Sequence, residues 1–177
     1  MWPASAAVLG SSKSKQEICM NPHSILQNSL LKDIKRTLDV ISLQYKKGED
    51  TYCLHCQCLV RFLYKGSLVA SSYDMYCRAE DEEDDTWDWS ESPEESLFDR
   101  QIDQVVKPLL PQRVIRVKTF HSNDIQIDLE NELSLEITVI SVSGHEAWRL
   151  FKQGDYENNT YVVYGNAVES IGFTEYQ

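Results

Sequence analysis

Glycine is scarce in this 177-residue chain, which has only seven, and the signature loops of several enzyme classes are missing. There is no Gly-rich phosphate loop, no His-Glu-x-x-His zinc motif and no Gly-x-Ser-x-Gly nucleophile turn. No apolar run approaches the length of a membrane-spanning helix. We therefore expect a protein without enzymatic activity, cofactor, metal ion or membrane contact.

The N-terminal stretch lacks the features of a secretory signal. Residues 1–19 have no basic n-region, and their brief apolar run is interrupted by serine. We expect them to form a disordered extension ahead of a single domain at 20–177. The five cysteines are an odd set, and without a signal peptide they are expected to be reduced thiols in the cytoplasm.

Positive charge is missing from one stretch, residues 80–95, which read EDEEDDTWDWSESPEE. Ten of these residues are acidic and none is Lys or Arg, so the stretch contributes −10 to a net charge of −11 and leaves −1 for the rest. Such local acidity repels nucleic acid and anionic membranes and attracts basic proteins. We name residues 80–95 the acidic stretch and expect an acidic loop at 79–95.

Two tryptophans within the acidic stretch favour a binding surface. An acidic strip accelerates association with a cationic partner, and tryptophan is a frequent interface hot spot. We interpret Trp87 as packed on the fold and Trp89 as exposed. The alternative is a solvated linker with one tryptophan packed on the sheet. The predicted partner-binding residues are Asp81, Glu82, Glu83, Asp84, Asp85, Asp88, Trp89 and Glu91.

Hydrophobic periodicity predicts two helices and about eight strands. The first helix is expected over 21–36 and the second after Ser92, which caps it in a Ser-Pro-Glu-Glu sequence. Strands over 38–45, 51–64 and 67–77 are joined by turns that are too short for a crossover. The later strands are expected at 113–120, 124–130, 133–140, 147–151 and 160–164. This pattern is α+β, with antiparallel sheet and the second helix between two β-meanders.

The sequence from Cys53 to Cys58, CLHCQC, offers four soft ligands within six residues. A strand through it would place Cys56 and Cys58 on one side and Cys53 and His55 on the other, which divides the set. We therefore interpret the cysteines as buried thiols, and Trp148 as a core residue. The alternative is a small hydrolase or metal-dependent enzyme that uses His55 and the nearby cysteines.

Five short sequence elements follow one another along the chain: YCLHCQCLVRF at 52–62, TWDW, SLFD, NELSLEI at 131–137 and HEAWRLF at 145–151. Together they resemble a family of small uncharacterised bacterial proteins over about residues 34–163, with a departure between Ile137 and Glu146. The family is similar in style to immunity proteins of polymorphic or contact-dependent toxin systems. The resemblance implies an inhibitor of a basic toxin, such as a nuclease, encoded nearby. The alternative is a housekeeping interaction domain.

Overall fold

Antiparallel strands make up most of the computed structural model, which describes residues 22–79, 96–165 and 167–171. The helical segments are α1 (Pro22–Leu26), η1 (Ser72–Tyr76), α2 (Leu97–Gln101), η3 (Ile102–Val106), η4 (Lys107–Leu109) and η5 (Glu130–Glu132). The first strands are β1 (Leu30–Thr37), β2 (Val40–Lys47), β3 (Asp50–Cys56), β4 (Leu59–Tyr64) and β5 (Ser67–Ser71). The others are β6 (Gln112–Thr119), β7 (Ile125–Leu129), β8 (Leu133–Thr138), β9 (Trp148–Lys152), β10 (Thr160–Tyr164) and β11 (Ala167–Ile171).

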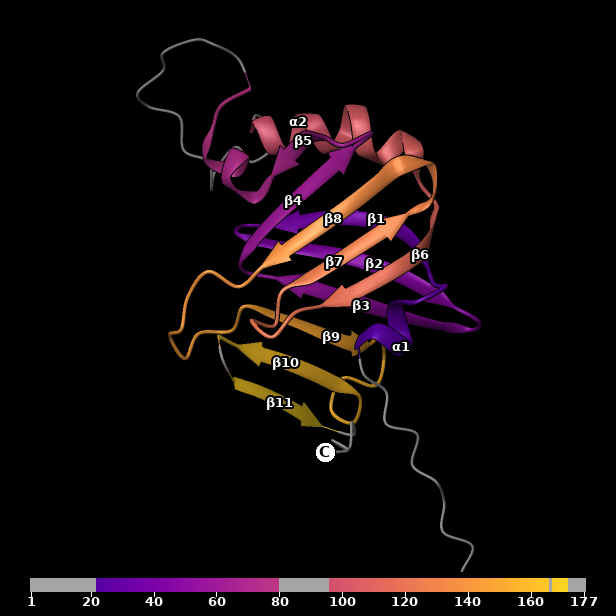
Figure 1. Ribbon diagram of the computed structural model, residues 1–177, viewed down its shortest axis with the longest axis vertical. Helices are drawn as coiled ribbons and strands as arrows, with labels where there is room; N and C mark the ends of the chain where they lie inside the picture. Colours follow the sequence, from indigo (N-terminus) through magenta and orange to yellow (C-terminus); the bar gives the residue numbers. More distant parts are fainter. Residues whose placement is uncertain (1–21, 80–95, 166, 172–177) are drawn as a thin grey trace, which may run out of the picture.

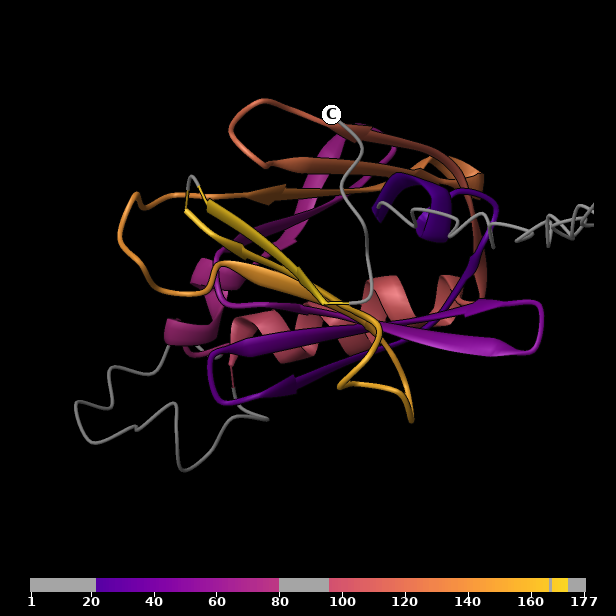
Figure 2. The ribbon, with the colours of Figure 1, turned by 90° about the horizontal axis from the view of Figure 1, so that it is seen from below.

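The described strands form one eleven-stranded open sheet in the order β11-β10-β9-β3-β2-β1-β6-β7-β8-β4-β5. The sheet is folded over, so that β6, β7 and β8 lie across β1, β2 and β3 (Figures 1 and 2). Its two halves are joined through β1 and β6, which pair only at Leu30↔Arg113 and Leu31↔Gln112. Because so few residues pair across this seam, the sheet folds over there and forms two layers.

One hydrophobic core lies between the two layers. The strands place alternate residues in it, as the burial of β2, β7 and β8 shows. The helix of α2 and η3 lies along the upper end of the molecule in Figure 1. Its buried side chains, Phe98, Ile102 and Val106, recur every four residues and therefore share one face. The Phe98 ring packs edge-to-face against Phe62 of β4, with 6.1 Å between centroids.

The α+β prediction is confirmed, but the count of about eight strands is too low. The prediction had no strand at β11 and treated β3 and β4 as one strand. The predicted helix over 21–36 is wrong beyond Leu26, because residues 30–37 form β1. A bulge between Leu31 and Asp33 inserts an extra residue, so the buried Leu31 and Ile34 are three apart. That spacing imitates the periodicity of a helix.

The predicted strand over 51–64 is divided at Gln57 and Cys58, where the chain crosses from one layer to the other. β3 pairs with β2 and β9, whereas β4 pairs with β5 and β8. The expected antiparallel pairings of 38–45 with 51–64 and of 51–64 with 67–77 are present, but they lie in different layers, so the three segments do not form one continuous meander. The predicted strand over 67–77 ends at Ser71 and continues as η1. The described helix α2 has Ser96 as its N-cap, and the predicted cap Ser92 lies outside the described residues.

The hydroxyl group of Tyr45 is an exception to the usual pairing of buried polar groups. Tyr45 is fully buried, and no other described residue hydrogen bonds to its Oη. Burial, with a smaller contribution from Cys56, raises the pKa of this phenol well above its ordinary value. An unsatisfied buried hydroxyl costs free energy that its removal recovers.

We therefore expect Tyr45→Phe to raise the free energy of unfolding by about 1 kcal/mol. Tyr52→Phe is the matched control on the neighbouring strand: burial, and then the charge of Asp50 and hydrogen bonding to it, raise the pKa of the Tyr52 phenol, so this hydroxyl has a polar neighbour. That control is expected to lose about 1 kcal/mol. Urea unfolding of both variants measures the difference, and a loss of stability in Tyr45→Phe would show that the hydroxyl has a partner.

Candidate functional site

The two ends of the acidic stretch are held side by side. The Leu97 amide donates to the Cys77 carbonyl (2.7 Å), and Arg78 and Ser96 form an isolated antiparallel bridge. Arg100 Nη1 donates to the Ala79 carbonyl (3.0 Å). The described residues that flank the acidic stretch, 77–79 and 96–100, therefore lie together, and we name them the base of the acidic stretch. The eight predicted partner-binding residues, from Asp81 to Glu91, lie outside the described residues.

The upstream side of this base is η1. Ser71 begins the turn, and its amide donates to Asp74 Oδ2 (2.7 Å) in a capping box. The buried Ser72 hydroxyl accepts from the Val60 amide (3.1 Å) and donates to the Cys58 carbonyl (3.3 Å). These bonds attach η1 to the start of β4. The Ser-x-x-Asp spacing from Ser71 to Asp74 is a sequence pattern that could have predicted this turn in place of a strand.

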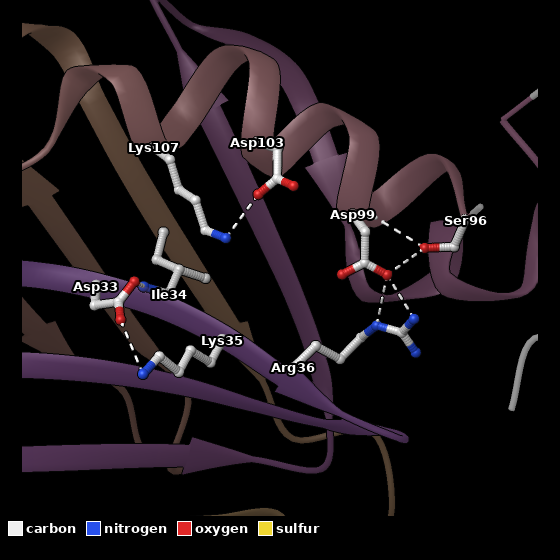
Figure 3. Close-up of polar contacts among 8 residues, drawn as sticks. All are labelled: Asp33, Ile34, Lys35, Arg36, Ser96, Asp99, Asp103 and Lys107. Atoms are coloured by element: carbon white, nitrogen blue, oxygen red, sulfur yellow. Dashed lines mark hydrogen bonds and ion pairs between the residues drawn. The ribbon is translucent and has the colours of Figure 1, made fainter. Parts of the chain in front are cut away.

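The downstream side is the start of α2, shown in Figure 3. Ser96 Oγ accepts from the Asp99 amide (3.1 Å) and donates to Asp99 Oδ2 (2.6 Å). Asp99 Oδ2 also accepts from Arg36 Nε (2.9 Å) and Arg36 Nη2 (2.5 Å). The Arg36 side chain is only 3% exposed, and it comes from β1. This part-buried ion pair connects the base of the acidic stretch to β1.

A small pocket opens beside this base. It has a volume of about 160 Å³, and its lining comes from the β1–β2 turn, the β3–β4 crossing, η1 and the segment after β8. We name it the tyrosine pocket, and the lining residues that matter below are Asp39, Cys58, Tyr73, Met75, Tyr76 and Ile140. Tyr73 is 71% exposed, Tyr76 49% and Ile140 70%. Large apolar side chains therefore face solvent together next to the acidic stretch.

Sequence reasoning missed the tyrosine pocket because it placed Tyr73 and Tyr76 within a strand. The backbone is strained at Leu38, which precedes the pocket residue Asp39. Leu38 lies in the two-residue turn between β1 and β2 with φ of +53°. The side chain of Leu38 is 55% exposed. A bulky residue in the left-handed region costs about 1 kcal/mol, and such strain is concentrated at functional surfaces.

His55 lies on the outer face of β3, opposite Arg149 of β9. Burial and the nearby Arg149 lower the pKa of His55, while Glu146 opposes the shift. The Arg149 guanidinium is engaged with both carboxylate oxygens of Glu146 and with the Tyr156 hydroxyl. The His55 ring packs edge-to-face on Phe151, with centroids 4.7 Å apart. These contacts are those of a structural ion pair and an aromatic cluster.

The described cysteines Cys53, Cys56 and Cys58 are buried, and Cys77 is half-buried, as free thiols. Burial raises the pKa of Cys53 and Cys56, and that of Cys58 to about 12. The prediction of buried thiols is confirmed for Cys53, Cys56 and Cys58. The described residues contain no group of three His, Cys, Asp or Glu side chains placed to hold a metal ion. Among the described residues, His55 and the cysteines therefore do not form such a group.

Two further hollows lie elsewhere on the described surface. A pocket of about 150 Å³ is lined by His23, Phe120, Trp148 and Tyr161, among others. An open groove of about 520 Å³ follows the β7–β8 turn. Neither adjoins the base of the acidic stretch. Within the described ranges, no helix has both the length and the apolar character needed to cross a membrane.

Comparison with protein-family models, with curated proteins and with solved structures finds no match to this chain.

Proposed function

We propose that this chain is a non-catalytic binding protein, an immunity-type inhibitor that neutralises a basic bacterial toxin such as a nuclease. The observation that carries the proposal is the joined base of the acidic stretch. The described residues on either side of this stretch are bonded to each other, so a segment with a charge of −10 is attached to the fold at one place. A local concentration of negative charge steers a cationic protein and opposes nucleic acid.

The free thiols of the described cysteines support a cytoplasmic location, where a protein of this kind protects the cell that makes it. A toxin that acts on nucleic acid needs a basic cleft, because its substrate carries one negative charge per phosphate. Carboxylates of the acidic stretch would occupy such a cleft in place of phosphate groups. Trp89 would add an apolar anchor to this contact.

Neutralising the five carboxylates at 81–85, to Asn or Gln, tests this proposal. We expect the association rate with the protein encoded next to this chain's gene to fall by about tenfold or more at low salt. The salt dependence of that rate is expected to flatten, because fewer charges contribute to steering. Stopped-flow kinetics at several ionic strengths measure both effects.

The control neutralises the same number of exposed carboxylates away from the base of the acidic stretch. The control removes the same number of negative charges, so an effect of net charge alone would appear in both variants. If the two variants associate equally fast, the acidic stretch is not the binding surface. The control residues are Glu49, Glu130, Glu132, Glu157 and Glu169.

A further inference from the structure

The tyrosine pocket combines the three features that bind an arginine side chain. Tyr73 and Tyr76 are both exposed, with ring centroids 6.3 Å apart in an edge-to-face arrangement. Exposed tyrosine rings attract a guanidinium group through their π faces. Asp39 supplies an exposed carboxylate, which accepts two parallel hydrogen bonds from arginine. Met75 and Ile140 supply apolar surface for the methylene groups of the stem.

The charges around the pocket favour a basic occupant. Arg36 bonds to Asp99, Arg100 bonds to the Ala79 carbonyl, and Arg78 also makes contacts within the protein. The acidic stretch begins one residue after Ala79 and carries ten negative charges. A second copy of this chain would bring two such stretches together, and their repulsion opposes self-association. A basic protein meets no such repulsion.

We propose that the basic partner inserts an arginine side chain into the tyrosine pocket, against Tyr73 and Tyr76, with its guanidinium group paired to Asp39. This inference rests on the proposed function, because it assumes that the partner is basic. It divides the contact into two parts. The acidic stretch accelerates encounter, and the pocket slows dissociation because its contacts form only at short range.

Substitutions in the pocket test the inference with the protein encoded by the adjacent gene. Tyr73→Ala and Asp39→Asn are each expected to raise the dissociation rate by about tenfold, with little change in the association rate. Tyr73→Phe keeps the π face and is expected to stay near wild type. Ile140→Ser is expected to weaken binding, whereas Ile115→Ser, at a residue of β6 that is 54% exposed, is the matched control.

Thermal melts of each variant accompany the kinetics, and they are expected to match wild type because the substituted side chains are exposed. If neutralising 81–85 slows association while Tyr73→Ala and Asp39→Asn leave dissociation unchanged, the pocket proposal is wrong and the proposed function stands. If neither set of variants changes the kinetics, the proposed function fails as well.

Competition by free amino acids tests the identity of the inserted side chain. Arginine is expected to weaken the complex more than lysine at equal ionic strength, because its planar group stacks on tyrosine and pairs bidentately with a carboxylate. The difference is expected to disappear in Tyr73→Ala. Equal competition by arginine and lysine in the wild-type protein would overturn the assignment of an arginine.

Discussion

Trp148→Ala is expected to lower the free energy of unfolding by about 4 kcal/mol, the largest effect that we predict for one substitution. The Trp148 side chain is 2% exposed and stacks on Tyr161, with ring centroids 5.5 Å apart. Its Nε1 donates to the Asn123 carbonyl (3.0 Å). Trp148 belongs to β9 in one layer and Asn123 to the β6–β7 turn in the other, so this residue joins the two layers.

Denaturant unfolding followed by circular dichroism measures the change, with the m-value as a check that the transition stays cooperative. Trp148→Phe is the control, because it keeps a ring in the core and loses only the hydrogen bond and part of the contact area. We expect it to lose about 1 to 2 kcal/mol. A loss in Trp148→Ala as small as that in Trp148→Phe would mean that the ring does not fill the core.

Asp99→Ala is expected to cost about 3 kcal/mol of stability. The substitution removes the carboxylate that accepts from Arg36 and from the Ser96 hydroxyl, and it leaves the charge of a nearly buried guanidinium group without that counterion. The loss of an ion-pair partner is costly in the interior, because water does not reach the remaining charge to replace that partner. The cap of α2 weakens as well, since Ser96 loses its acceptor.

Asp103→Ala is the matched control on the same helical segment (Figure 3). Asp103 pairs with Lys107, but its side chain is 62% exposed, so we expect a change within about 0.5 kcal/mol. Thermal and urea unfolding of the two variants compare a buried with an exposed ion pair. Equal losses would show that Arg36 is solvated without Asp99, and the base of the acidic stretch would then need another anchor.

The partner kinetics connect this base to function. If Arg36 and Asp99 hold the base in place, Asp99→Ala is also expected to weaken binding at temperatures where the variant remains folded. Asp103→Ala is expected to bind as wild type. This comparison uses the same proteins as the stability measurement.

The sequence by itself determined the features that depend on local pattern and composition. Alternation of polar and apolar residues identified β7 and β8, whose buried and exposed residues alternate as expected. A large aromatic residue within an apolar strand placed Trp148 in the core. The concentration of charge in the acidic stretch was also plain, because it requires only counting.

The tertiary structure alone decided where strands pair and which loops meet. The bulge in β1 and the crossing at Gln57 and Cys58 depend on partners far along the chain, and local periodicity does not record such partners. The tyrosine pocket likewise joins Asp39, Tyr73 and Ile140, which are separated by long stretches of sequence. Packing of two layers around one core brings these loops together, because hydrophobic burial rewards contact without regard to sequence separation.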